Sequence, residues 1–202
     1  MLTSQLLLLL VLIMEGAAGS QLVPQIPDDV QLGITSTYNI WAHALRQQKD
    51  SQGQPVTRTD VDIKTLLSPD EWLMINLAPM DGPHPLYSND NTALRTEFLL
   101  DYVIADPVQP NDEKMSQPDG LVVPNLSGKS LTFRKDSEGK ITVEGIDVTN
   151  TKTLSNGITV YTLSNFLFDH RERIQEALEK LLSNRSNFGP FGRGAPMPPR
   201  PY

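Results

Sequence analysis

Hydrophobic and polar positions are spaced helically in the first half of the chain and alternate in much of the second half. The first helical stretch has apolar residues at intervals of three and four: Tyr38, Trp41, Ala42 and Leu45. This spacing predicts a helix that begins near residues 35–37, where threonine and serine can cap it. Residues 21–33, with Pro24 and Pro27, precede it as an extended leader.

The next segment is apolar in two short runs. Ile63, Leu66 and Leu67 have the spacing of a brief helix, and residues 68–71 favour a turn or one helical turn with Pro69 at its first position. The continuous apolar run from Trp72 to Ala78 has the length of a buried strand, although periodicity alone does not exclude a helix. A further helix is expected over residues 92–103, with Asn91 as its cap.

Alternation then indicates β-structure. The expected strands cover residues 120–123, 130–134, 140–144, 146–149 and 158–163. A five-residue loop that ends in Gly139 joins the second and third of them, which is typical of a hairpin. Asn156-Gly157 predicts the tight turn before the last strand, because both residues tolerate positive φ.

An amphipathic helix and a tail of unusual composition follow. Residues 169–183 carry one apolar stripe, which either docks on the chain's own domain or binds a partner helix. Residues 184–202 are rich in Pro, Gly and Arg and lack acidic residues, so we expect them to be disordered. The prolines favour polyproline II, which serves as a spacer or a binding shape, and the basic tail could fold back on the acidic body or bind an anionic surface.

The N-terminus has the pattern of a secretory signal peptide. Leu6–Met14 is a run of nine apolar residues, followed by small residues up to Ser20. A membrane span needs about 20 apolar residues, so the run is too short to cross a bilayer. We therefore expect residues 1–20 to be a cleaved signal and the product to be secreted and extracellular, without a membrane span.

Composition narrows the possible chemistry. The chain has 202 residues, no cysteine, three histidines and a formal net charge of −7. This acidic balance argues against nucleic-acid binding. The lack of cysteine excludes thiolate metal sites and cysteine nucleophiles, and no Gly-x-Ser-x-Gly elbow or phosphate-binding loop is present. Neither Asp28-Asp29 nor the Asp60, Asp62 pair has the spacing of a calcium loop. We expect no catalytic residues, no metal and no cofactor.

Residues 126–168 resemble the second conserved box of the fasciclin-type domain, the family of fasciclin I, periostin and the transforming-growth-factor-β-induced protein. Asn156-Gly157-Ile158 matches its Asn-Gly-Val step, and Glu144-Gly145 stands at an earlier Asn-Gly step. The usual His is replaced by Thr159 or Val160. Leu73–Asp81 resembles the first box, and Leu99–Ile104 resembles the Leu-Leu-x-Tyr-His-Val segment between the boxes, with Tyr102 present and Val103 in place of His.

The resemblance implies an α+β fold: one fasciclin-like domain over residues 34–168, with helices packed on a small β-sheet or wedge, followed by the C-terminal amphipathic helix. It implies a non-enzymatic interaction module of the extracellular matrix or of cell adhesion. The partners would be extracellular proteins or matrix components, with weak self-association open. Tyr102 is the candidate interaction residue, although its place on the apolar side of its helix also suits the core.

Two sequons, at Asn125 and Asn184, are candidate glycosylation sites in a secreted chain. The alternative function is a secreted carrier of a small hydrophobic ligand, held in a cavity that residues 72–78 and the helices would line. A hydrolase of unrecognised type is a third hypothesis, which would need converging polar side chains in a deep cleft.

Overall fold

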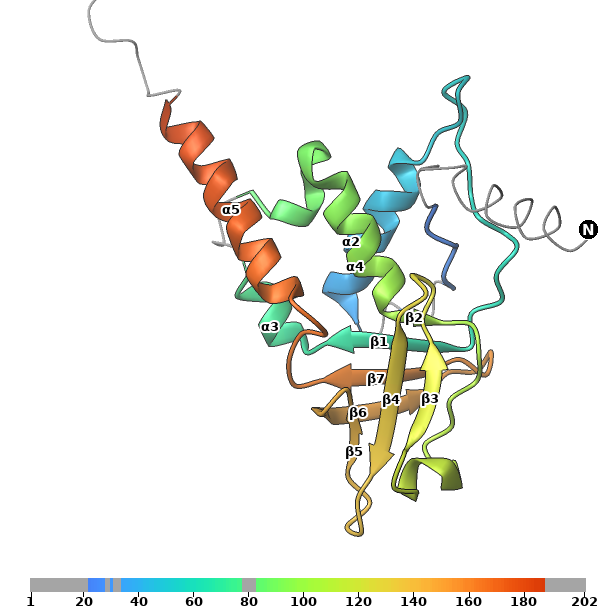
Figure 1. Ribbon diagram of the computed structural model, residues 1–202. Helices are drawn as coiled ribbons and strands as arrows, with labels where there is room; N and C mark the ends of the chain where they lie inside the picture. Colours follow the sequence, from blue (N-terminus) through green and yellow to red (C-terminus); the bar gives the residue numbers. More distant parts are fainter. Residues whose placement is uncertain (1–21, 28–29, 31–33, 78–82, 188–202) are drawn as a thin grey trace, which may run out of the picture.

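The computed structural model describes residues 22–27, 30, 34–77 and 83–187. The expected signal peptide and most of the expected tail lie outside these residues. Helices gather on one side of the molecule and strands on the other, and α5 extends beyond the rest (Figure 1). The helices are α2 (Thr35–Gln47), α3 (Glu71–Ile75), α4 (Thr92–Asp101) and α5 (His170–Asn187), with 3-10 turns η2 (Pro85–Tyr87), η3 (Asn89–Asn91) and η4 (Glu113–Ser116).

The strands form one mixed sheet. They are β1 (Thr65–Pro69), β2 (Val103–Ile104), β3 (Leu121–Pro124), β4 (Ser130–Lys135), β5 (Ile141–Val143), β6 (Ile146–Thr153) and β7 (Thr159–Leu163). Their order is β2-β1-β7-β6-β5-β4-β3. Neighbours are antiparallel except β1 and β7, which run parallel with Leu66 opposite Val160.

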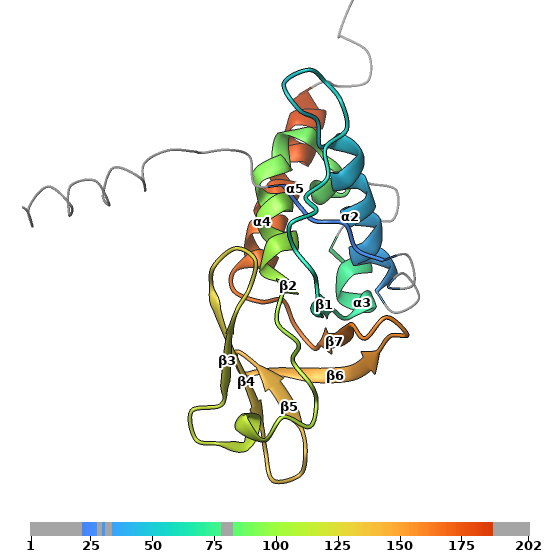
Figure 2. The same ribbon diagram turned by 90° about the vertical axis from the view of Figure 1, so that its right-hand side faces the viewer.

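The two ends of this sheet approach each other. The Leu126 N–H, just after β3, donates to the Val103 carbonyl in β2 at 2.8 Å. The strands β3, β4 and β5 cross the direction of β1, β7 and β6, which gives the sheet a wedge shape (Figure 2). The α+β class and the helices packed on a small sheet are therefore confirmed.

One hydrophobic core joins the sheet to the helices. Trp41, Leu66, Phe98, Phe133 and Tyr161 are among its fully buried side chains. The N-terminal segment belongs to it too, because Val23 and Ile26 are buried and the Trp41 indole donates to the Pro24 carbonyl at 2.6 Å. Residues 22–27 are thus packed on the domain.

The expectations for residues 63–78 were wrong, because strand and helix exchange places. Residues 65–69 form β1, which is buried at every position. Its polar side chains are satisfied inside: the Thr65 hydroxyl bonds the Asp106 carbonyl, and the Ser68 hydroxyl bonds Thr37. The apolar run begins as α3 instead, because the Asp70 carboxylate caps it by accepting from the Trp72 N–H at 2.9 Å.

The predicted β-hairpin is confirmed as β4 and β5, and β6 runs further than expected, to Thr153. Gly120, before β3, requires glycine. Its φ is +73°, and a Cβ there would stand 2.6 Å from the Phe133 carbonyl oxygen. The close approach lets β3 pair with β4.

The C-terminal helix begins at His170, as expected, but continues to Asn187, so residues 184–187 are helical and do not belong to the expected disordered tail. Ile174 and Ala177 are buried against the domain, whereas Leu182 is 42% exposed. The apolar stripe therefore docks on the chain's own domain in its first half. Its second half is more exposed and extends beyond the other helices (Figure 1), although Leu181 stays half-buried.

Candidate functional site

Tyr102 and Asn125, two of the residues singled out from the sequence, lie in or beside one buried group of polar side chains. Its centre is Asp101, the last residue of α4, which is completely buried. We call it the Asp101 cluster; its members are Asp101, Asn125, Ser127, Lys129 and His170.

Every oxygen of the Asp101 carboxylate accepts hydrogen bonds. Oδ2 lies 2.7 Å from His170 Nε2 and 2.7 Å from Lys129 Nζ. Oδ1 accepts from the Ser127 hydroxyl and from Asn125 Nδ2, the latter at 3.2 Å. The cluster thus ties the end of α4 to the β3–β4 connection and to the first residue of α5.

These contacts set the ionisation of the group. Burial by itself would raise the pKa of Asp101, but hydrogen bonds from His170, Lys129 and Ser127 outweigh it, so the pKa is lowered. Burial likewise opposes the charge on Lys129, yet its bonds to Asp101 and Glu97 raise its pKa. The cluster therefore holds a paired carboxylate and ammonium at neutral pH.

A second carboxylate, Glu97, connects the cluster to the surface. It accepts from Arg173 at 2.6 Å and from Lys129 at 3.0 Å. The hydrogen bond from Arg173 is the main reason that the pKa of Glu97 falls from 4.5 to about 2. Lys129 also lies 4.6 Å from the centre of the Phe168 ring, a cation–π contact.

The cluster has the residue types of a serine hydrolase but not their order. A nucleophilic serine must donate to the histidine, and the aspartate must hold the other side of the ring. Here Ser127 donates to Asp101 and Asn125, and the buried Nδ1 of His170 has no hydrogen-bond partner within the described residues. The arrangement fastens three elements together and leaves the serine without a base.

The burial of Asn125 corrects its assignment as a glycan acceptor. The side chain is 5% exposed, and Nδ2, the atom to which a glycan would attach, donates to both the carbonyl and the carboxylate of Asp101. A glycan there would break both bonds and would need space inside the core. Asn184 is exposed on α5, and its glycosylation stays a prediction.

Tyr102 also requires correction as an interaction residue. Its side chain is completely buried, and its hydroxyl accepts from the Leu167 N–H at 2.6 Å. Its ring packs on Phe98 with centroids 4.7 Å apart. Burial raises its pKa, so the hydroxyl stays neutral. The core role that the apolar side of its helix suggested is the one that the structure shows.

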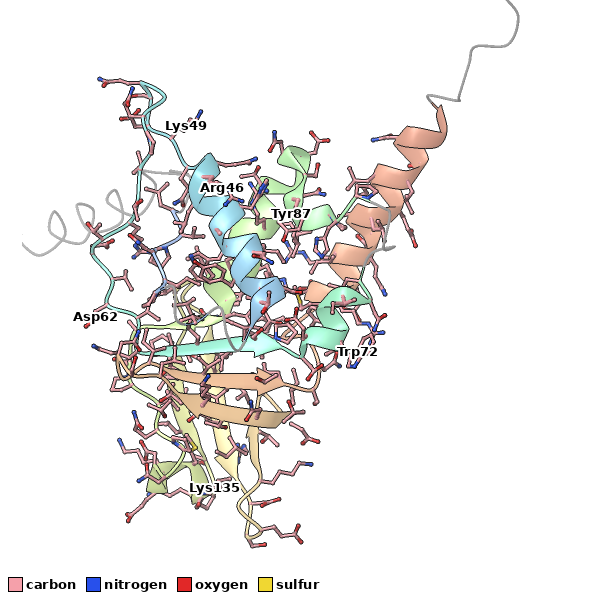
Figure 3. The ribbon with its side chains drawn as sticks, turned by 180° about the vertical axis from the view of Figure 1, so that it is seen from behind. Arg46, Lys49, Asp62, Trp72, Tyr87 and Lys135 are labelled. Carbon is pink, nitrogen blue, oxygen red and sulfur yellow. The ribbon has the colours of Figure 1, made fainter. Side chains whose placement is uncertain are left out.

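An open groove in the described part of the chain shares no residue with this cluster. Its volume is about 690 Å³, and it lies between η2, η3 and the second half of α5. We call it the Tyr87 groove; its lining residues are Pro83, His84, Tyr87, Ser88, Asp90, Leu181 and Asn184. Figure 3 shows Tyr87 at the opposite end of the molecule from Lys135.

Aromatic contacts hold Tyr87 at the groove. Its ring meets His43 and His84 edge-on, with centroids 5.0 and 5.3 Å apart. His43 Nε2 also lies 3.0 Å from the Tyr87 carbonyl oxygen. Burial lowers the pKa of both histidines, so the rings flanking Tyr87 favour the neutral form. The groove therefore presents a fixed aromatic wall.

A second exposed feature is α3. Trp72 is 70% exposed and Ile75 is 46% exposed, one helical turn apart, while Met74 between them is buried. The sequence analysis missed this surface because it took the apolar run for a strand. The capping sequence Ser68-Pro69-Asp70-Glu71 was the signal that could have identified the helix.

Other candidates are surface ion pairs. Asp60 pairs with Arg58 at 2.9 Å, and Asp62 pairs with Lys64 at 2.7 Å. Asp28-Asp29 lies outside the described residues. Within the ranges that the structure describes, no group of three His, Asp or Glu side chains is placed to hold a metal ion. No helix in that part of the chain combines the length and the apolar character that a membrane crossing requires.

Comparison with known proteins identifies no family model and no curated protein that match this chain. Among solved structures, the chain is similar to a FAS1 domain pair from the insect cell adhesion molecule fasciclin I. The TM-score is 0.47 and the sequence identity 15%, over 72% of this chain and 49% of that chain. The chain thus spans about half the length of the domain pair.

Proposed function

We propose that the protein is a secreted, non-enzymatic interaction module of the extracellular matrix or of cell adhesion. The observation that carries the proposal is Trp72, a large aromatic side chain that is 70% exposed on a helix held in place by the fold. Tryptophan dominates the energetics of many protein interfaces, because it buries a large area with little loss of conformational entropy.

The fold fixes the position of this side chain. The Asp70 carboxylate caps α3, and Met74 anchors it in the core. The Glu71 carboxylate accepts from both the N–H and the hydroxyl of Ser36, at 3.1 and 2.5 Å, in the first turn of α2. The helix therefore offers Trp72 and Ile75 to a partner with little ordering left to do on binding.

Charge indicates what such a partner looks like. Asp70 and Glu71 stand beside Trp72 in sequence, and the whole chain carries a formal charge of −7. An apolar pocket with a basic rim on an extracellular protein would complement this surface. The signal-like residues 1–20 support an extracellular location, where a chain without cysteine depends on core packing for its stability.

A binding assay on cell-derived matrix tests the proposal. We expect full-length secreted protein to bind decellularised matrix, and Trp72→Ala to reduce that binding at least tenfold. Val122→Ala is the matched control, because Val122 is 55% exposed on β3, away from α3. Absence of binding by the unaltered protein, or equal binding by Trp72→Ala, would contradict the proposal.

The alternative, a carrier of a small hydrophobic ligand, loses the lining that was expected for it, because Trp72 and Ile75 point outward. The Tyr87 groove, at about 690 Å³, still has the volume of a ligand site. Native mass spectrometry separates the two functions. An interaction module appears as the empty chain or a weak dimer, whereas a carrier retains an extra mass of a few hundred daltons.

A further inference from the structure

The Tyr87 groove combines a fixed aromatic wall with an acidic edge. Asp90 is exposed, and its carboxylate forms no ion pair with any basic side chain of the described residues. Pro83 and Leu181 supply apolar lining. Grooves that bind polyproline II segments have this composition: aromatic and apolar walls, with an acid that receives an arginine of the peptide.

The chain carries a segment of matching chemistry. Residues 188–202 read FGPFGRGAPMPPRPY, with five prolines, two arginines and no acidic residue. Prolines set φ in advance, so a polyproline II segment loses little entropy when it binds. Its two arginines, Arg193 and Arg200, have the charge that would complement the carboxylate of Asp90.

The connection between groove and segment is short. Leu181 and Asn184 line the groove, and α5 ends at Asn187, about 9 Å further along the helix axis at 1.5 Å per residue. Fifteen further residues reach about 47 Å at 3.1 Å per residue, several times the distance needed to return to Tyr87. Glycines at 189, 192 and 194 allow the chain to reverse its direction after the helix.

We propose that residues 188–202 dock in the Tyr87 groove of their own chain as a polyproline II segment, with an arginine beside Asp90. Tethering gives the segment a local concentration in the millimolar range, so even a weak contact is well populated. The groove is then self-occupied, and a proline-rich or arginine-containing peptide from another protein must displace it. The inference does not depend on the function proposed for Trp72, which lies on α3 near the other end of α5 (Figure 3).

Disulfide trapping in the full-length chain tests this contact, because the natural sequence contains no cysteine. Ser88→Cys with Met197→Cys places one thiol in the groove and one in the segment, with every proline kept. Protein without glycans, expressed in bacteria, avoids a sugar on Asn184 at the edge of the groove. We expect this pair to close at least tenfold faster in a redox buffer than the same pair with Pro198→Ser, Pro199→Ser and Pro201→Ser. That tail variant leaves the folded domain untouched.

Further variants separate docking from random collision. Tyr87→Ala should slow closure to the rate of the proline-free tail, and Tyr87→Phe, which keeps the ring, should retain most of the rate. Lys135→Cys with Met197→Cys should close slowly in every background, since Lys135 lies at the far end (Figure 3). Equal rates with and without the prolines would overturn the proposal. So would disulfides formed mainly between chains, since these would place the segment on a second copy.

Discussion

The Asp101 cluster and the Tyr87 groove contain similar side chains in opposite situations. Both hold a histidine, a serine, an asparagine and an aspartate. In the cluster Asp101 and His170 are completely buried, and every oxygen of the carboxylate is bonded. In the groove the same types border open space of about 690 Å³. The comparison teaches that the types of residue in a group do not reveal its role, whereas access and unused bonding capacity do.

The closed group has consequences for stability, and the open surfaces have consequences for binding. Removing the charge of a buried carboxylate leaves its basic partners uncompensated, which costs far more than losing a surface ion pair. Removing an exposed aromatic side chain costs little folding energy. The variants below separate the two kinds of region by this criterion.

The largest effect is expected for Asp101→Asn. It leaves His170 without its carboxylate and Lys129 with Glu97 alone, and we expect the free energy of unfolding to fall by about 3–5 kcal/mol. Urea denaturation followed by circular dichroism measures the change. Asp62→Asn, which removes only an exposed pair with Lys64, serves as the control and should cost no more than about 1 kcal/mol. If Asp101→Asn lowers the free energy of unfolding by no more than Asp62→Asn does, the cluster does not stabilise the fold.

A smaller loss is expected for Tyr102→Phe. It leaves the Leu167 N–H without its acceptor in the core, which costs about 1–3 kcal/mol. Tyr87→Phe is the matched control, because no hydrogen bond of its hydroxyl occurs within the described residues, and its stability should change by less than about 0.5 kcal/mol. Thermal unfolding of both variants checks the difference. An unchanged Tm in Tyr102→Phe would contradict the role of its hydroxyl.

Acid should remove the stabilisation that Glu97 provides, over a pH range that its pKa defines. The pKa of Glu97 is about 2 in the folded protein against an ordinary 4.5, so the unfolded chain takes up the proton first. The stabilisation from this carboxylate is complete above pH 4.5 and is lost as the pH falls towards 2. We expect Tm to decline over this range, and less steeply in Glu97→Gln. Glu179→Gln, on the exposed side of α5, should follow the unaltered protein.

The smallest effect on stability is expected for Trp72→Ala. Because the side chain is 70% exposed, the free energy of unfolding should change by no more than about 0.5 kcal/mol. Urea denaturation of this variant measures its stability. If the stability is unchanged, a loss of matrix binding comes from the missing contact of Trp72 and not from unfolding. A loss of several kcal/mol would mean that Trp72 belongs to the core and would remove it from the proposed interface.

The sequence predicted the elements whose patterns are strong. The hairpin of β4 and β5, the last strand and the helices α2, α4 and α5 follow from periodicity and turn residues. The prediction from the sequence was wrong between residues 63 and 78. There a fully buried strand contains Thr65 and Ser68, and a short helix exposes Trp72 to solvent. The tertiary hydrogen bonds that satisfy Thr65 and Ser68 do not appear in a local pattern. The cap at Asp70 is a local signal, but the apolar run after it favoured a strand.

The Asp101 cluster was not predictable as a group. Asp101 and His170 are 69 positions apart, and their contact depends on how α5 docks beside α4. A single acid within the apolar stretch Leu99–Ile104 was the available signal, since a buried carboxylate needs partners. The sequence could not name them. Asn125 illustrates the same limit, because a sequon gives no information about the burial of its amide.

The parallel pairing of β1 with β7 constrains how the chain acquires its structure. Thr65 lies opposite Thr159, so the centre of the sheet joins segments more than ninety positions apart. Such distant contacts close slowly, because the loop entropy is lost before the pairing is gained. A growing polypeptide leaving the ribosome therefore cannot complete its sheet until Leu163 has emerged. Until then β1, whose five residues are all buried in the folded protein, lacks one neighbour and is exposed to chaperones and to aggregation.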